Sequence, residues 1–242
     1  MEIKQLLTAF ERYAYGNSLH NAFTELLDWT LLPFKKYDTC DEQNQALESY
    51  RTNPKVEQLV NLVTLIGDLS EDFNDPIGEL YMQAISNGHN GQYFTPTPIC
   101  EMITAMSIGD AFEDGQTVLD PACGSGRMLL AAGKMNRHFK LYGADLDSTC
   151  CKIALFNMLL NSLQGEITHM NSLSNEFYTG YKVSTMLING YHMPYYTEFT
   201  KPEQSYIWLK PNQKVEVKST FKTHFEPVRA TNHINGVQGS LF

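Results

Sequence analysis

The sequence predicts an α/β protein with a Rossmann-like domain behind a helical N-terminal subdomain. Residues 1–90 carry apolar side chains at helical spacing, whereas residues 91–200 alternate short apolar strands with helices. Such alternation is typical of a mostly parallel sheet with helices on both faces. A glycine-rich turn, Gly124-Ser-Gly126, joins one of these strands to the next helix. Residues 201–242 differ in pattern and are expected to form a C-terminal hairpin and tail.

The N-terminal subdomain shows four helical stretches in a row. The first is interrupted at Gly16-Asn17, and Ser18 can cap the second. Pro54 suits the first turn of a third helix, and Asp75-Pro76 suits the start of a short fourth helix. Asn87-Gly88 is expected to end that fourth helix.

The Rossmann-like region contains four expected strands. They are Thr117–Asp120, Leu141–Asp145, Glu166–Met170 and Lys182–Ile188. Thr97 and Ser148 are placed to cap two of the helices between them. In the C-terminal region, the apolar runs Tyr206–Leu209 and Val215–Val217 flank a turn, and this arrangement predicts a hairpin.

Composition limits the class of protein. Hydrophobic residues make up 43% and charged residues 19% of the chain, which excludes collagen-like, coiled-coil and intrinsically disordered proteins. No apolar run reaches the roughly 18 residues of a membrane-spanning helix, and the N-terminus lacks the pattern of a signal peptide. Five cysteines without a CxxC pair indicate a reducing compartment. We therefore expect a cytoplasmic protein that has no disulfide and binds neither membrane nor metal.

The charge balance limits the partners. The chain has 18 Lys and Arg against 27 Asp and Glu, a formal net charge of −9. Because basic residues that neutralise phosphate supply most non-specific affinity for nucleic acid, this chain alone is a poor candidate for tight nucleic-acid binding. A local basic patch or a basic partner can still supply that affinity.

The strongest functional signal is the segment Val118–Gly126, which reads Val-Leu-Asp-Pro-Ala-Cys-Gly-Ser-Gly. A strand, a sharp glycine turn and a helix N-terminus let the backbone approach a ligand, and free N–H groups there favour a carboxylate. A carboxylate at the strand end can bind an ammonium group. One pocket for an amine and a carboxylate suits the methionine part of S-adenosylmethionine. We expect this cofactor to contact Asp120, Cys123, Gly124, Ser125 and Gly126.

Other ligands fit this loop less well. A dinucleotide site prefers GxGxxG, and the third glycine is absent; a Walker loop needs a following Gly-Lys-Ser/Thr, which is also absent. A glycine-rich turn without a ligand remains the alternative.

Asp145, at the end of the second strand, has a spacing that suits hydrogen bonds to ribose hydroxyls. Asp147 competes for this role, because alternation along the strand points both side chains the same way.

Several segments occur in the order found in one known family. Gly91-Gln-Tyr-Phe-Thr-Pro96 precedes the loop, Asp75-Pro-Ile-Gly-Glu-Leu-Tyr81 lies further upstream, and Asn157-Met-Leu-Leu160 follows Asp145. With these motifs the chain resembles the amino-group DNA methyltransferases. In particular it resembles the methylation subunit of type I restriction–modification systems, over roughly residues 55–190.

The resemblance implies a Rossmann-like S-adenosylmethionine-dependent methyltransferase fold and methylation of adenine N6 in DNA. It implies that Tyr93, Thr95 and Pro96 line the methionine end of the cofactor site, although a simple helix cap also accounts for the Thr-Pro pair. Sequence recognition in type I systems resides in a separate specificity subunit. The resemblance therefore implies DNA as a partner, together with such a subunit.

Two positions depart from the family pattern. The acid that reads the cofactor adenine after the third strand is matched by Asn171, whose side-chain oxygen can still accept from the adenine amino group. The catalytic Asn-Pro-Pro-Phe/Tyr after the fourth strand is matched by Asn189-Gly-Tyr-His192. In the family motif, the Asn oxygen and the next carbonyl accept the two protons of the target amine. An aromatic ring then stacks on the flipped base.

The resemblance therefore assigns Asn189 to the amine and the cofactor, with Tyr191 and His192 as candidates for stacking. Another register places His192-Met-Pro-Tyr195 at this position. Both prolines are lost, and Gly190 adds flexibility. Two alternatives to an active adenine methyltransferase follow. One is a catalytically inactive cofactor-binding or interaction module of the same family, and the other is a methyltransferase that acts on a small molecule or a protein.

Overall fold

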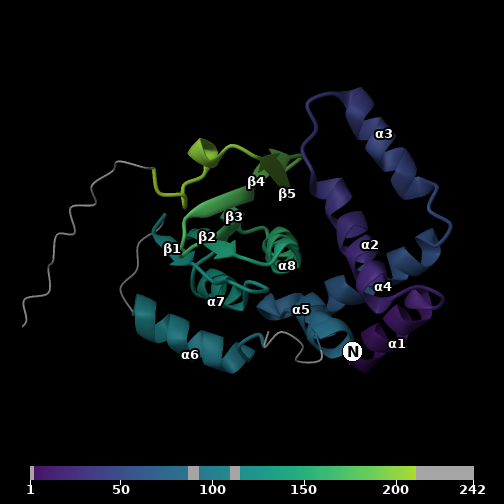
Figure 1. Cartoon of the computed structure of the whole chain (residues 1–242), viewed down its shortest axis with the longest axis horizontal. Helices are drawn as coiled ribbons and strands as arrows, with labels where there is room; N and C mark the ends of the chain where they lie inside the picture. The colour runs from purple at the N-terminus through teal and green to yellow at the C-terminus, as the bar shows by residue number, and fades with distance from the viewer. Residues whose placement is uncertain (1–2, 87–92, 110–114, 211–242) are drawn as a thin grey trace, which may run out of the picture. The chain divides into compact units, whose positions relative to one another are not determined.

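The computed structural model describes residues 3–86, 93–109 and 115–210 (Figure 1). These residues belong to one compact unit that ends at Lys210. The first part is helical, as expected. Its elements are α1 (Ile3–Ala14), α2 (Leu19–Leu31), η1 (Leu32–Phe34), α3 (Cys40–Arg51), α4 (Val56–Leu69), η2 (Glu71–Phe73), α5 (Pro76–Tyr81) and the π-helical turn η3 (Met82–Ser86). The predicted end of the fourth helix at Asn87-Gly88 lies outside the described residues.

Local capping explains where several of these helices begin. The Ser18 hydroxyl accepts a hydrogen bond from the Asn21 backbone N–H at 3.1 Å, so the predicted cap of α2 is confirmed. Asp75 caps α5, as predicted, whereas α4 begins only at Val56, after Pro54. Helix α3 was not predicted, because none of its described side chains is buried and it lacks an apolar stripe.

The sheet of the described residues has the order β1-β2-β3-β4-β5. The strands are β1 (Thr117–Asp120), β2 (Lys140–Asp145), β3 (Gln164–Asn171), β4 (Glu176–Ile188) and β5 (Tyr191–Phe199). Strands β1, β2 and β3 run parallel, as predicted, but β4 and β5 are antiparallel to their neighbours. The prediction of a mostly parallel sheet is therefore wrong for its second half, and β5 was not predicted.

Two short turns set the directions of β4 and β5. Only residues 172–175 connect β3 to β4, and only Asn189 and Gly190 connect β4 to β5. A parallel neighbour needs a crossover of about a dozen residues, so these links allow antiparallel pairing alone. Asn189 and Gly190 both have left-handed backbones, with φ of 50° and 85°. This conformation is the one that a type I′ hairpin turn requires.

Helices α7 (Arg127–Met135) and α8 (Ser148–Leu160) pack on each other and on one face of the sheet, and α6 (Thr97–Ile108) packs on α7 (Figure 1). On that face, Gly143 lies against Leu129 and Ile167. The pleat sends the neighbouring residues, Tyr142 and Glu166, to the opposite face. In the described part of the chain, helices therefore cover one face of the sheet, and the prediction of helices on both faces is wrong there.

Two of the helix caps differ from the prediction. Asp147, and not Ser148, caps α8: its Oδ1 accepts hydrogen bonds from the N–H groups of Thr149 (2.7 Å) and Cys150 (3.3 Å). Thr97 is the first residue of α6, which has no side-chain cap. Both helices thus begin one residue earlier than the sequence pattern indicated.

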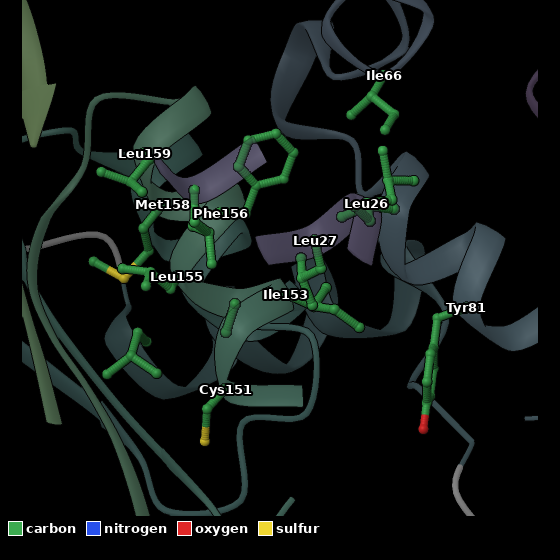
Figure 2. Packing of buried hydrophobic residues seen from close by; sticks show 14 of the residues in the cluster. Leu26, Leu27, Ile66, Tyr81, Cys151, Ile153, Leu155, Phe156, Met158 and Leu159 are labelled. Atoms are coloured by element: carbon green, nitrogen blue, oxygen red, sulfur yellow. The ribbon is translucent and has the colours of Figure 1, made fainter. Parts of the chain in front are cut away.

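Helix α8 is the centre of the hydrophobic core. Nine of its side chains are buried, on all sides of the helix, which is the pattern of a helix with no solvent face. Figure 2 shows Ile153 and Phe156 of α8 beside Leu26 and Leu27 of α2. The helical subdomain and the sheet therefore share one core. Residues on both sides of the boundary expected near residue 90 contribute to that core.

The segment that follows η5 (Pro202–Gln204) crosses the helix-free face of the sheet. Glu166, fully buried in β3, accepts hydrogen bonds from the Ser205 hydroxyl (2.5 Å) and the Tyr206 N–H (3.2 Å). Further on, the Leu209 N–H donates to Asn175 Oδ1 at 3.0 Å. The expected strand at residues 206–209 is thus an irregular segment, and the rest of the predicted hairpin lies outside the described residues.

A buried carboxylate joins the helical subdomain to the glycine turn. Asp75 Oδ1 accepts the Gly78 N–H at 2.8 Å as the cap of α5. Asp75 Oδ2 accepts the Ser125 hydroxyl (2.6 Å) and Arg127 Nε (2.8 Å), and Asn157 Nδ2 donates to Oδ1 at 2.7 Å. The carboxylate therefore ties α5, the glycine turn, α7 and α8 to one point.

Burial dominates the electrostatics of this cluster and leaves the pKa of Asp75 raised overall. Burial raises the pKa of Asp75, whereas the Arg127 charge and the hydrogen bonds from Ser125 and Asn157 lower it. The Arg127 side chain is only 10% exposed and also pairs with Glu79 at 3.1 Å. Removing the Asp75 carboxylate would leave the buried guanidinium with one partly exposed carboxylate partner, Glu79, which is costly.

We expect Asp75→Ala to lower the free energy of unfolding by about 3–5 kcal/mol, the usual cost of breaking a buried ion pair from one side. Urea denaturation followed by circular dichroism measures this loss. Asp28→Ala is the matched control, because Asp28 is half exposed and pairs with Lys152 on the surface. That change should cost about 1 kcal/mol or less. Equal losses for the two variants would show that the cluster does not hold the fold together.

Candidate functional site

The glycine turn lies where β1 ends and α7 begins, at the carboxyl edge of the parallel strands. Gly124 and Gly126 have left-handed backbones, with φ of 53° and 84°. The Cys123 N–H donates to the Ala144 carbonyl (2.9 Å), and the Gly126 N–H donates to the Cys123 carbonyl (2.8 Å). These bonds fold the turn over the end of β2, where ligands of open α/β sheets bind.

Asp145 holds the turn in this position. Its Oδ2 accepts the Gly124 N–H at 2.8 Å, and its Oδ1 accepts the Asp147 N–H at 2.9 Å. The structure thus brings Asp145 to the glycine turn, as the sequence analysis expected for two parts of one site. The carboxylate of Asp147, the competing candidate, caps the N-terminus of α8.

Asp120 adds a second carboxylate to this edge. Its Oδ1 accepts the Ala122 N–H at 3.1 Å. Burial raises the pKa of Asp120, and the nearby charge of Asp145 raises it further, against the lowering by the Ala122 hydrogen bond. In the described part of the chain this partly buried carboxylate has no ion pair with a cation, so it is suited to receive a positively charged ligand group.

The side chains of Cys123 and Ser125 point into the protein. The Cys123 thiol is buried beside Gly143, and burial raises its pKa far above the usual value. The Ser125 hydroxyl is bonded to Asp75. These two residues, predicted to contact the cofactor, therefore shape the turn through their backbone, while their side chains anchor it.

Tyr93, Thr95 and Pro96, which were predicted to line the cofactor site, differ in their surroundings. Tyr93 is 72% exposed, and the Thr95 carbonyl accepts a hydrogen bond from Arg127 Nη1 at 3.3 Å. Tyr93 and Thr95 line a cavity of about 100 Å³ together with the glycine turn, and Pro96 does not. The structure therefore brings two of these three residues to the turn.

Phe94 is a site residue that the sequence analysis did not select. A Cβ atom placed on Gly124 would lie 3.0 Å from the Phe94 ring, so the ring lies directly over the turn. Tyr81 stacks on the same ring, with centroids 5.8 Å apart, and the Arg127 guanidinium lies 5.6 Å from it. The Tyr-Phe pair at 93–94 was the available signal, and the structure places both aromatic residues at the cavity beside the turn.

Arg127 and Asn157 were also not selected. Arg127 follows the last glycine of the turn directly, and Asn157 is a buried polar residue in an apolar helix. Asn157 Nδ2 donates to the Ser125 carbonyl at 2.9 Å as well as to Asp75. A buried amide among apolar residues requires such partners, and that requirement was the signal in the sequence.

These residues fit one end of S-adenosylmethionine. The two left-handed glycines let Phe94 and Ala154 pack closely against the turn, and the carboxylates of Asp120 and Asp145 beside it favour a cation. Sites for drug-sized ligands usually have about 300–1,000 Å³, so the cavity of about 100 Å³ holds only one end of such a molecule. A larger hollow of about 540 Å³ lies between residues 35–38 and the end of β5, away from the turn.

Asn171 does not have the role expected for it. It lies at the end of β3, and its side-chain oxygen accepts hydrogen bonds from the N–H groups of Leu173 (3.0 Å) and Ser174 (3.2 Å). Both acceptor positions of this oxygen are used by its own turn. It is therefore not free to read the adenine amino group in this arrangement.

The predicted catalytic residues Asn189, Tyr191 and His192 are exposed and lie at the β4–β5 hairpin turn. In the register of β4 on β3, Glu176 lies opposite Asn171 at the carboxyl edge, and β4 then runs back past the beginning of β3. At ~3.3 Å per residue, Asn189 is roughly 40 Å along the strand from that edge. The structure does not bring these residues to the glycine turn, because β4 is antiparallel.

No group of three His, Cys, Asp or Glu side chains in the ranges 3–86, 93–109 and 115–210 is placed to hold a metal ion. Among the helices of that same part of the chain, none is both long and apolar enough to cross a membrane.

Two solved structures are similar to this chain at low identity. One is the type I restriction–modification methyltransferase subunit from Streptococcus thermophilus, with 14% identity and a TM-score of 0.38 over 67% of this chain and 57% of that one. The other is described as a class I S-adenosylmethionine-dependent methyltransferase from Listeria monocytogenes. It has 15% identity and a TM-score of 0.41 over 68% of this chain and 52% of that one.

Curated relatives match part of the chain. The MjaVII methylase subunit of a type I restriction enzyme from Methanocaldococcus jannaschii is 29% identical over 121 residues, 46% of this chain and 20% of that protein. The MjaVIII methylase subunit from the same organism is 27% identical over 116 residues, which are 45% of this chain and 19% of that protein. A ribosomal protein L11 methyltransferase from Caldanaerobacter subterraneus is 40% identical over 69 residues, which are 28% of this chain and 22% of that protein.

The chain thus spans about a fifth of the length of these relatives. A family model described as N-6 DNA Methylase matches residues 73–227, which is more than half of the chain. That range includes the glycine turn, Asp75 and the whole described sheet. The chain therefore belongs to the N-6 DNA methylase family.

Proposed function

We propose that this protein binds S-adenosylmethionine at the glycine turn and takes part in methylation of adenine N6 in DNA. The observation that carries the proposal is the hydrogen bond from Gly124 to Asp145, which fixes the Asp120–Gly126 turn at the carboxyl edge of β1 and β2. Membership of the N-6 DNA methylase family supports the reaction type. The bound cofactor would supply an electrophilic methyl group on a positively charged sulfur.

The residues of the site have separate tasks in this proposal. Asp120 would pair with the ammonium group of the cofactor, because its carboxylate is partly buried and has no cationic partner in the described site. Gly124 would keep the turn and the Phe94 ring in contact, because a side chain there would meet the ring. Asp145 would hold the turn and offer its remaining acceptor capacity to ribose hydroxyls. Phe94 would close the site against water over the turn.

DNA would be bound together with a partner. The net charge of −9 disfavours tight DNA binding by this chain alone. The curated relatives named above are methylase subunits of type I restriction enzymes, and the chain matches about a fifth of each. We therefore propose a separate DNA-recognising subunit as the partner.

The position of Asn189 favours a second candidate function. An adenine-N6 site needs acceptors for the two protons of the target amine beside the cofactor, and Asn189 lies at the far end of β4. A cofactor-binding or interaction module without its own amine site accounts for that placement. Cofactor binding is common to both candidates, and methyl transfer distinguishes them.

Calorimetry tests the cofactor site. We expect the protein to bind S-adenosylmethionine or S-adenosylhomocysteine, and Gly124→Val to weaken binding about 100-fold or more. A side chain at this left-handed position meets the Phe94 ring. Gly16→Val is the matched control, because Gly16 is also left-handed but has open space around it. No binding heat from the wild-type protein at millimolar ligand would remove the glycine turn as a cofactor site.

The pKa of Asp120 predicts how cofactor binding depends on pH. The ionised carboxylate attracts the ammonium group, so affinity is complete above the pKa and falls as the pH drops through it. Because the pKa of Asp120 is raised from 3.8, this loss should begin at a higher pH than for an exposed Asp. Affinity measured across a pH series should show this fall, and Asp120→Asn should bind more weakly with a flatter profile. Identical profiles for both proteins would assign the ammonium group to another residue.

Methyl transfer from labelled S-adenosylmethionine to unmethylated DNA separates the two candidate functions. For the isolated chain we expect little or no product, far below the ~1–1,000 turnovers per second of typical enzymes, because Asn189 is remote from the turn. Addition of the DNA-recognising partner should restore methylation only if the partner completes the site. Ordinary turnover by the isolated chain that Asn189→Ala abolishes would show that the hairpin turn reaches the cofactor.

A further inference from the structure

The end of the β4–β5 hairpin forms an arm that extends past the rest of the sheet. The pairing of β4 with β3 ends at Val183, while β4 and β5 pair with each other as far as Ile188 and Tyr191. We define the arm as residues 184–195. It contains no charged residue. Two strands alone are marginally stable in water, so an arm of this kind gains stability from a partner.

The arm exposes apolar side chains on both faces. Alternation along the hairpin places Met186, Ile188, Tyr191 and Met193 on one face, where their exposed fractions are 37–73%. Leu187, on the other face, is 67% exposed. Large exposed apolar surfaces of this kind mark interaction sites.

Strand β1 forms the opposite end of the sheet. In the described residues β1 is an edge strand that pairs with β2 alone. Thr117 and Leu119 of β1 line an open groove of about 340 Å³ with Tyr142 and the 206–207 segment, and Leu119 is 55% exposed. An edge strand presents unpaired N–H and C=O groups that can pair with a strand from another chain.

Helix α6 adds an apolar stripe at this end of the domain. It packs on α7, and β1 packs on the same helix. Its exposed apolar residues repeat at helical spacing and are Ile99, Met102, Ile103 and Met106. Such a stripe on a surface helix normally faces a packing partner. We call the edge of β1, its groove and this stripe together the β1 surface.

We propose that the arm of one molecule adds as a strand to the β1 surface of a second molecule of the same chain. The arm has no Asp, Glu, Lys or Arg and exposes apolar side chains on both faces, mostly on the face of Met186 and Ile188, which suits a strand buried against an apolar layer. The β1 surface has apolar groups and a strand edge that no other strand of residues 3–86, 93–109 and 115–210 pairs with. Main-chain hydrogen bonds would supply affinity, and the side chains of Leu187 and Leu119 would add apolar contact.

The two surfaces belong to opposite ends of the strand order, so the contact is head-to-tail. A head-to-tail contact is heterologous, and its repetition makes rings or open chains rather than only a two-fold dimer. Each molecule would contribute one arm and one β1 surface to different neighbours. Non-specific aggregation would not require one arm and one β1 surface in each contact, so this requirement can be tested.

Sedimentation of the full-length chain over a concentration series tests the association. We expect the wild-type protein to self-associate, and Leu187→Lys or Leu119→Lys to raise the dissociation constant about tenfold or more, because each buries a charge at the interface. Leu173→Lys is the matched control: Leu173 is fully exposed in the β3–β4 turn and belongs to neither surface. Circular dichroism checks that each variant is folded, and Met106→Lys in α6 replaces Leu119→Lys if that one is not.

Mixing the two variants gives the decisive result. The Leu119→Lys protein keeps an intact arm, and the Leu187→Lys protein keeps an intact β1 surface. A mixture should therefore form a one-to-one heterodimer that cannot grow, while each variant alone stays monomeric. A monomeric wild-type protein would overturn the proposal. So would equal association of the wild type and both variants, or a mixture that remains monomeric.

Discussion

The buried carboxylate of Asp75 is the interaction on which the rest of this structure depends. Its hydrogen bonds come from the start of α5, the glycine turn, α7 and α8, which are far apart in the sequence. Apolar packing alone is non-directional and would let these elements slide. A charged acceptor with four donors at fixed positions sets their mutual distances, and so places the glycine turn relative to the helical subdomain.

The parts of the fold that depend on local chemistry could be predicted from the sequence. The parallel strands, the glycine turn, the Ser18 cap and the Asp75 cap each have a signal within a few residues, and the structure confirms them. The direction of β4 could not be predicted from a list of strands, because it depends on the short turn at residues 172–175. Family order then placed Asn189 beside the cofactor, where an antiparallel strand does not bring it. Phe94, Arg127 and Asn157 meet the turn only through tertiary contacts.

The mixed sheet separates two kinds of surface within one domain. The carboxyl edge of β1, β2 and β3 gathers acidic and glycine residues, whereas the β4–β5 hairpin extends past the opposite edge with apolar side chains. Ligand chemistry and chain-to-chain contact therefore need not compete for the same residues. A change in the exposed arm can alter association without passing through the hydrogen bonds that shape the glycine turn.

The central position of α8 has a consequence for how this domain opens. Proteins exchange their amide hydrogens through cooperative units of unequal stability, and the slowest unit is the one whose opening requires the most packing to be lost. Helix α8 touches the sheet on one side and the helical subdomain on the other, and its first turn is fixed by Asp147 next to Asp145. Its amides should therefore exchange only through global unfolding. The glycine turn contacts this helix at Ala154 and Asn157. The turn should therefore lose its structure only when the whole domain unfolds.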